Sequence, residues 1–235
     1  MKEAYKKASL AFVLIFLIVV AGCSGADEKT RKNEALSSQQ FAEAYMRDGK
    51  PARALQELAK AQALTPEDPK ITHMMGVAYW QKKEYALAEQ SFLKAVALKD
   101  DYSEVWNTLG ALYISQNRFS DAVRVLEKAL SNVYYNSYES AMSNLGWALY
   151  KLGRNAEAKV KLAEAIEIDP NQPVTRVNMA ILLYDEENYE EAFKHANEAL
   201  RVAPDYANAH LQKGMIQIKM GDKEGARESL TQAWK

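Results

Sequence analysis

The chain has 235 residues, and its 30 Lys and Arg nearly balance its 31 Asp and Glu. This balance leaves no basic field of the kind that binds nucleic acid, so we do not expect a nucleic-acid partner. The single cysteine excludes a disulfide within the chain. Apart from its N-terminus, the composition is that of a helical protein, and the length suits one large domain or an array of repeats.

The first 22 residues have the organisation of a secretory signal peptide. Three lysines within residues 1–7 precede an uncharged apolar run over residues 8–20. As a helix this run would be only about 20 Å long, which is short for a hydrocarbon core of roughly 30 Å. We therefore expect residues 1–22 to be a signal peptide rather than a permanent membrane span.

The apolar run ends in Val20-Ala21-Gly22-Cys23, which resembles the lipobox of bacterial lipoproteins. The resemblance implies lipid attachment at Cys23 and membrane association through N-terminal acyl chains, in which each buried methylene contributes about 0.8 kcal/mol. In that family an Asp after the cysteine commonly signals retention in the inner membrane, so Ser24 implies the outer membrane. The alternative is an inert cysteine buried in a short membrane anchor.

A polar segment follows the cysteine. Residues 24–34, SGADEKTRKNE, contain no apolar period. A segment of this composition buries too little apolar surface to offset its conformational entropy. We therefore expect residues 23–34 to be a lipidated cysteine and a flexible tether.

From residue 35 onward the chain repeats, with a spacing of 34 residues between most neighbouring copies. The stretches that start at Thr72, Trp106 and Met142 all have Gly at their fifth place and Ala at their seventeenth and twenty-fourth places. A fixed period of this length is typical of a solenoid. Small residues at these places let two antiparallel helices approach closely, and large apolar residues fill the remaining space: Leu58, Phe92, Leu126, Leu162 and Leu230. The fifth copy departs, with Ala196 at the large place.

The pattern resembles the tetratricopeptide repeat, whose small residue at place 8 and alanines at places 20 and 27 occur in all six copies. The resemblance implies an all-α fold, a tetratricopeptide-repeat superhelix (α-solenoid) of about six helix hairpins that bury their apolar faces by stacking. The six predicted repeats are residues 35–68, 69–102, 103–136, 139–172, 173–206 and 207–235. No polar helix follows the sixth repeat, so we expect its outer face to be frayed or covered by a partner.

The 34-residue spacing is interrupted once, between the third and fourth repeats. Residues 131–146, SNVYYNSYESAMSNLG, contain two extra residues, which are Ser137 and Tyr138 in this alignment. The insertion is either a tolerated loop or a specific feature of this connection.

In the tetratricopeptide family, places 2, 5, 9, 12 and 13 of each repeat face a concave groove. His73 and Asn107 occupy such places, and a polar rim could be supplied by Gln39, Gln81, Asn107 and Ser143. Places 9 and 12 carry apolar residues in five successive repeats: Val77 and Trp80, Ala111 and Ile114, Trp147 and Tyr150, Ile181 and Tyr184, Met215 and Ile218. Such an apolar lining suits a protein segment with apolar anchors, whereas the alternative is that these apolar residues pack between helices.

We find no catalytic constellation in the sequence. His195 and His210 have no partner at metal-ligand spacing, and the G-x-S-x-G, H-E-x-x-H and Gly-rich phosphate motifs do not occur. Groove-place basic residues are scattered, which argues against a clamp for a C-terminal carboxylate. We therefore expect no enzyme activity, no metal or cofactor and no small-molecule substrate.

A lipobox, a short polar tether and six such repeats together resemble the type IV pilus pilotin family. The segments NTLGALYISQNRFSDA and VYYNSYESAMSNLGWAL are similar to parts of that family. The resemblance implies an outer-membrane lipoprotein that faces the periplasm, binds the secretin subunit and promotes secretin localisation and multimerisation for pilus assembly and twitching motility. The alternative is a tetratricopeptide lipoprotein that serves as an adaptor for β-barrel assembly or for peptidoglycan synthases and hydrolases.

Overall fold

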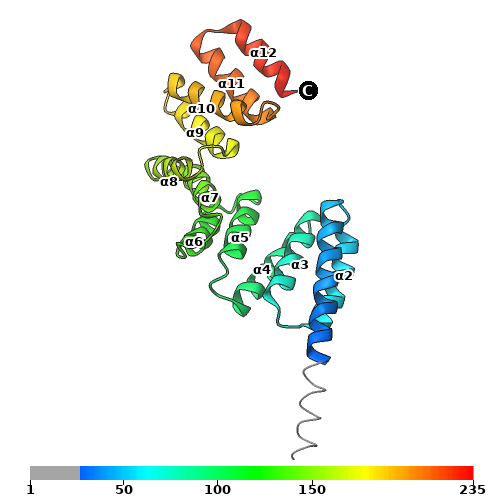
Figure 1. Ribbon diagram of the computed structural model, residues 1–235. Helices are drawn as coiled ribbons and strands as arrows, with labels where there is room; N and C mark the ends of the chain where they lie inside the picture. The colour runs from blue at the N-terminus through cyan, green and yellow to red at the C-terminus, as the bar shows by residue number, and fades with distance from the viewer. Residues whose placement is uncertain (1–26, 235) are drawn as a thin grey trace, which may run out of the picture. The chain divides into compact units, whose positions relative to one another are not determined.

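The computed structural model describes residues 27–234, and every regular element within this range is a helix, which confirms the predicted all-α fold. The predicted signal peptide and lipid-attachment residue Cys23 lie outside the described residues. The first helix covers residues 27–47. The labelled helices of Figure 1 follow it: α2 (Pro51–Leu64), α3 (Pro69–Gln81), α4 (Tyr85–Leu98), α5 (Ser103–Ser115), α6 (Phe119–Leu130), α7 (Tyr138–Lys151), α8 (Asn155–Ile168), α9 (Pro173–Asp185), α10 (Tyr189–Val202), α11 (Ala207–Met220) and α12 (Lys223–Ala233).

The chain divides into two compact units, one ending at Lys99 and the other starting at Asp100. In the first unit, α3 packs against α2 on one side and α4 on the other. In the second unit, α5–α6, α7–α8, α9–α10 and α11–α12 are four helix hairpins, and each hairpin also contacts the next one along the chain (Figure 1). This stacking buries the apolar face that a single hairpin would leave exposed.

The first helix begins earlier than predicted from the sequence. Residues 27–34 were predicted to belong to a flexible tether, but they are helical. Two ion pairs with i,i+4 spacing span them, Arg31 with Asp27 at 3.7 Å and Lys32 with Glu28 at 2.6 Å. Each such pair stabilises a helix by about 0.2–0.5 kcal/mol, and the buried Ala35 on the next turn ties the helix to the first unit.

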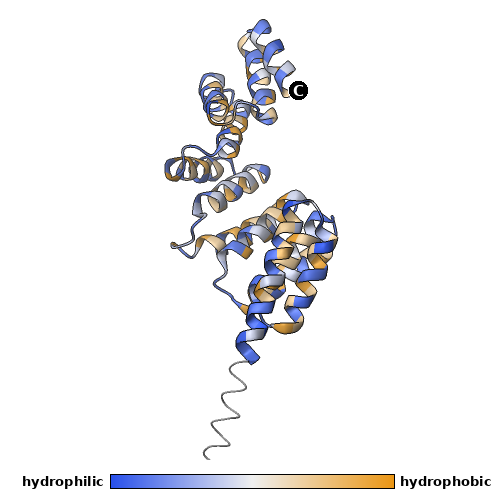
Figure 2. Cartoon of the chain, turned by 45° about the vertical axis from the view of Figure 1, so that its right-hand side comes forward, coloured by the Kyte–Doolittle hydropathy of each residue, from blue (hydrophilic) through white to orange (hydrophobic). Residues whose placement is uncertain are grey.

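In every hairpin except α9–α10, where Ala196 stands at the large place, a small residue on the first helix packs against a large one on the second. A Cβ atom built on Gly76 of α3 would lie 2.5 Å from Cε1 of Phe92 on α4. One built on Gly146 of α7 would lie 2.8 Å from Cγ of Leu162 on α8. Phe92 and Leu162 are fully buried, so these contacts form the centre of their hairpins. The helices of the first unit accordingly carry both hydrophobic and hydrophilic faces in Figure 2.

The turn inside each hairpin places one residue in the left-handed backbone region. Glycine occupies this position in three hairpins, but Lys83 (φ 62°), Asn117 (φ 59°) and Glu187 (φ 59°) occupy it in the others. A side chain costs free energy in this conformation, because its Cβ approaches the following carbonyl oxygen. These three turns therefore carry backbone strain that the glycine turns avoid.

One connection between repeats differs from the others. Four connections contain four residues each, over 65–68, 99–102, 169–172 and 203–206, whereas the one between α6 and α7 spans residues 131–137. The preceding helix α6 has 12 residues, while α2, α4, α8 and α10 have 14 each. The long loop thus combines inserted residues with a shortened second helix.

The last hairpin ends in a helix with a polar outer face. The side chain of Asp222 caps α12 by accepting a hydrogen bond from the backbone N–H of Gly225 at 2.9 Å. A shallow surface along α12 is lined by Lys223, Glu224, Arg227, Glu228, Thr231 and Gln232. These side chains are charged or polar and can be solvated.

Candidate functional site

The predicted stripe residues lie on α3 in the first unit and on α5, α7, α9 and α11 in the second, and they keep contact with solvent. The eight members on α3, α5, α7 and α9 are partly exposed, and Met215 and Ile218 on α11 are 38% and 56% exposed. The residue that follows the first member on each helix is fully buried: Ala78, Leu112, Ala148, Leu182 and Ile216. The stripe is therefore distinct from the packed face of the helices, although its binding role stays a prediction.

The fourth repeat carries the aromatic members of the stripe. The rings of Trp147 and Tyr150 lie 5.2 Å apart, and the ammonium of Lys151 is 5.5 Å from the Trp147 ring. The Tyr150 hydroxyl donates a hydrogen bond to Oδ2 of Asp185 at 2.5 Å, which links α7 to the end of α9. Burial, together with this hydrogen bond and the negative charge of Asp185, raises the pKa of Tyr150 to about 12. The pair thus offers aromatic surface that is held in place from two helices.

In the first unit, the stripe residue Val77 borders a hollow of about 420 Å³ between the first helix and α3. The other lining residues are Glu43, Met46, Arg47 and Gln81. An apolar floor with charged and amide groups at its margin suits a protein segment that carries one apolar anchor.

His73 was predicted to face the groove, but the structure buries it. Only 7% of the residue is exposed, and its ring lies 5.7 Å from that of Phe92 on α4. At this place the side chain is directed against the second helix of its own hairpin, so it is part of the core. A direct contact between His73 and a partner is therefore not supported.

Two of the four predicted rim residues are also buried. Gln39 and Ser143 are buried, and Ser143 accepts a hydrogen bond from Thr175 on α9 at 2.8 Å. Of the predicted rim residues, only Gln81 is largely exposed, and Asn107 is half-buried.

Asn107 connects three segments of the second unit. Its Nδ2 donates to the hydroxyl of Tyr135 at 3.2 Å, and its Oδ1 accepts from Nδ2 of Asn144 at 2.9 Å. Burial raises the pKa of Tyr135. The side chain predicted as a groove contact therefore fixes the loop between α6 and α7, at which the 34-residue spacing is interrupted.

The remaining histidines are structural. His195 on α10 lies with Nδ1 3.4 Å from Nη1 of Arg176 on α9, and burial followed by the positive charge of Arg176 lowers the pKa of His195. His210 contacts the carbonyl oxygen of Pro204 through Nε2 at 2.7 Å. Across residues 27–234, no group of three or more His, Cys, Asp or Glu side chains could hold a metal ion. The helices described within this range are too short or too polar to cross a membrane.

Stacked helix hairpins with small–large packing define an α-helical repeat protein. Tetratricopeptide repeat models match residues 40–103 and 107–173, and a further one matches residues 183–235. The chain belongs to the tetratricopeptide repeat family.

Two solved structures and one sequence relative are similar to much of the chain. The type IV pilus assembly protein PilF of Pseudomonas aeruginosa is 26% identical over 185 residues, which cover 75% of this chain and 73% of PilF. A structure of P. aeruginosa PilF has a TM-score of 0.77 at 23% identity and covers 85% of this chain and 90% of its own. A structure of PilW, described as a widely conserved type IV pilus biogenesis factor, also has a TM-score of 0.77, at 22% identity, and covers 84% of this chain and 91% of its own.

Proposed function

We propose that this protein is a pilotin, a lipid-anchored adaptor that binds the type IV pilus secretin subunit. In this proposal Cys23 carries the acyl chains, and the repeats lie on the periplasmic side of the outer membrane. The stripe of partly exposed apolar residues on the first helices receives an apolar segment of the secretin. The observation that carries the proposal is this exposed stripe in a chain similar to PilF over most of its length.

The proposed mechanism requires no chemical step. Anchoring restricts the adaptor to the membrane surface, because each buried acyl methylene contributes about 0.8 kcal/mol. Capture of several secretin subunits at that surface raises their effective concentration. The higher concentration favours ring formation although the contacts between secretin subunits are unchanged. The aromatic pair Trp147 and Tyr150 supplies the rigid apolar area that commonly dominates protein interfaces.

The test compares two double variants that each replace two apolar residues by Glu. Trp80→Glu with Trp147→Glu changes the stripe in the second and fourth repeats. Leu93→Glu with Val160→Glu changes exposed apolar residues on the second helices of the same repeats and is the matched control. In pull-downs from solubilised envelopes, we expect the wild type and the control to retain the secretin. The amount of secretin that co-purifies with the stripe variant should be at least tenfold lower.

Three outcomes would contradict the proposal at different points. Equal retention by both double variants would place the secretin contact elsewhere on the repeats. No secretin with any form, together with normal pilus pores in a deletion strain, would reject the pilotin assignment. Loss of porins or altered cell shape in that strain would favour the adaptor for β-barrel or peptidoglycan assembly instead. Separately, mass spectrometry that finds the Cys23 thiol without acyl groups would reject the anchor.

A further inference from the structure

The loop between α6 and α7 has a defined conformation at the surface of the second unit. Oδ1 of Asn132 accepts a hydrogen bond from the backbone N–H of Tyr134 at 3.0 Å, and the carbonyl of Asn132 accepts one from the N–H of Tyr135 at 3.1 Å. The Tyr135 hydroxyl accepts a hydrogen bond from Nδ2 of Asn107 at 3.2 Å, which ties the loop to α5. These contacts present Val133 and Tyr134 outward, and the two residues are 71% and 89% exposed.

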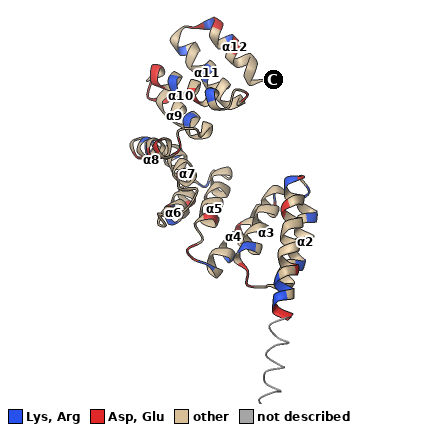
Figure 3. Ribbon diagram, viewed as in Figure 1, with Lys and Arg blue, Asp and Glu red and all other residues tan. Residues whose placement is uncertain are grey.

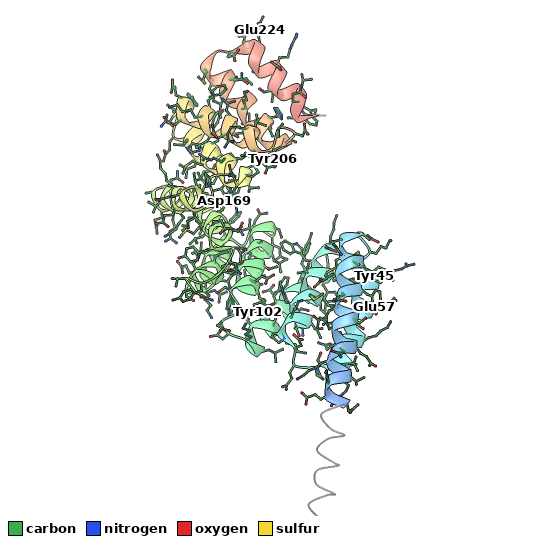
Figure 4. The ribbon with its side chains drawn as sticks, viewed as in Figure 1. Tyr45, Glu57, Tyr102, Asp169, Tyr206 and Glu224 are labelled. Atoms are coloured by element: carbon green, nitrogen blue, oxygen red, sulfur yellow. The ribbon has the colours of Figure 1, made fainter. Side chains whose placement is uncertain are left out.

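The loop borders a hollow of about 420 Å³, which we call the tyrosine hollow. It is lined by residues 101–104 at the start of α5, where Figure 4 labels Tyr102, and by loop residues 132 and 134–137. Its volume is near the lower end of the range for ligand pockets, about 300–1,000 Å³. A site of this size suits one or two side chains and not a folded element.

The charge of the tyrosine hollow has one sign. Its described lining includes the carboxylates of Asp101 and Glu104, both exposed, and no Lys or Arg. Figure 3 marks acidic residues in red along the segment that leads into α5. Three tyrosines contribute to the same lining, and the faces of aromatic rings attract cations. Carboxylates and tyrosine rings around one hollow together favour a positively charged side chain.

We propose that the tyrosine hollow docks a Lys or Arg side chain from an exposed segment of a partner protein. The carboxylates of Asp101 and Glu104 attract the cation, and the rings of Tyr102 and Tyr134 pack against its apolar stem. Asn132, through the Nδ2 group that its bond to Tyr134 leaves unused, and Asn136 line the same hollow and can bond the backbone of the segment. This contact is independent of the stripe on the first helices and of the identity of the partner bound there.

The experiment titrates ¹⁵N-labelled protein with two five-residue peptides followed by NMR. The basic probe is acetyl-Gly-Arg-Gly-Lys-Gly-amide, and the neutral control is acetyl-Gly-Gln-Gly-Gln-Gly-amide. We expect the basic probe to shift the backbone amides of residues 101–104 and 132–137 in a saturable manner, and the neutral peptide to bind at least fivefold more weakly. Because exposed charges are screened, raising the salt from 50 to 500 mM should weaken the basic probe several-fold.

Variants then separate the two kinds of contact. Asp101→Asn with Glu104→Gln should weaken the basic probe by about two- to fivefold per carboxylate, and Tyr134→Ala by about two- to fivefold. The matched control is Glu224→Gln with Glu228→Gln, which removes two exposed carboxylates from α12, away from any tyrosine that lines the hollow. Unchanged far-UV circular dichroism and thermal unfolding would verify that each variant is folded.

Four results would overturn the proposal. They are equal binding of the neutral peptide, shifts confined to the first-helix stripe, full affinity in the Asp101→Asn with Glu104→Gln variant, and the absence of shifts at 10 mM basic probe. Chitobiose serves as a sugar probe, since tyrosine and amide groups also bind carbohydrate. If chitobiose alone shifts the amides of the hollow, the site recognises a sugar and the proposal is wrong.

Discussion

The first-helix stripe and the tyrosine hollow are two candidate surfaces with different origins. The stripe recurs at the same two places of five repeats, beside positions that are fully buried. The hollow occurs where the repeat is interrupted, since only that connection is longer than four residues. A repeated surface follows from the packing that every hairpin needs, whereas an interruption leaves room for a feature that packing does not require.

The largest difference should lie between a repeated core residue and the exposed tip of the loop. Leu162→Ala empties the space opposite Gly146 and should lower the free energy of unfolding by about 2–5 kcal/mol. Tyr134→Ala removes a side chain that is 89% exposed and should change it by no more than about 0.5 kcal/mol. Urea unfolding followed by circular dichroism measures both, and similar losses would show that the loop is part of the core.

Asn107 should matter for stability because it joins the loop to two helices. Asn107→Ala leaves half-buried polar groups of Tyr135 and Asn144 without these bonds and should cost about 1–3 kcal/mol. The matched variant Tyr135→Phe removes only the hydroxyl and should cost about 1 kcal/mol. Hydrogen exchange of residues 131–137 should accelerate in both. Unchanged exchange in Asn107→Ala would mean that the turn at Asn132 holds the loop by itself.

Tyr150 should make stability depend on pH in the alkaline range. Its pKa of about 12 in the folded protein exceeds the ordinary value of 10 in the unfolded chain. The stabilisation therefore is complete below pH 10 and is lost as the pH rises through about 12. Unfolding in urea at pH 9, 10 and 11 should show a loss that is smaller in Tyr150→Phe than in the wild type.

The same titration can be followed directly. ¹³C NMR of the tyrosine ring should assign a midpoint near 12 to Tyr150 in the wild type. Asp185→Asn removes the charge and weakens the hydrogen bond to the phenol, so the midpoint should fall while burial keeps it above 10. A Tyr150 midpoint at 10 in the wild type would be inconsistent with the contact to Asp185.

The smallest effects should come from the turns inside the hairpins. Lys83→Gly and Glu187→Gly relieve a positive φ and should each raise the free energy of unfolding by about 0.5–1 kcal/mol. Gly153→Ala introduces the same strain in the fourth repeat and should lower it by about 1 kcal/mol. Thermal unfolding of the three variants tests this order, and stabilisation by Gly153→Ala would contradict it.

The all-α repeat fold could be predicted from the amino-acid sequence, because the contacts that define it are local. Gly76 meets Phe92 only 16 positions later, and Gly146 meets Leu162 at the same spacing. Such pairs appear in the sequence as small and large residues at fixed places. The period also predicted which places would lie next to the core, including the stripe that keeps its exposure.

Which polar residues are available to a partner depends on contacts between helices, which the sequence pattern does not specify. His73, Gln39 and Ser143 are at predicted groove or rim places, yet they are buried against neighbouring helices. Asn107 is hydrogen-bonded to Tyr135 and Asn144, which are 28 and 37 positions away. No regular spacing in the sequence predicts these contacts. Polar side chains are directed by hydrogen bonds to particular neighbours, whereas apolar ones need only a face to bury. For that reason the period predicted the scaffold, and the long-range bonds around the interrupted connection shaped the tyrosine hollow.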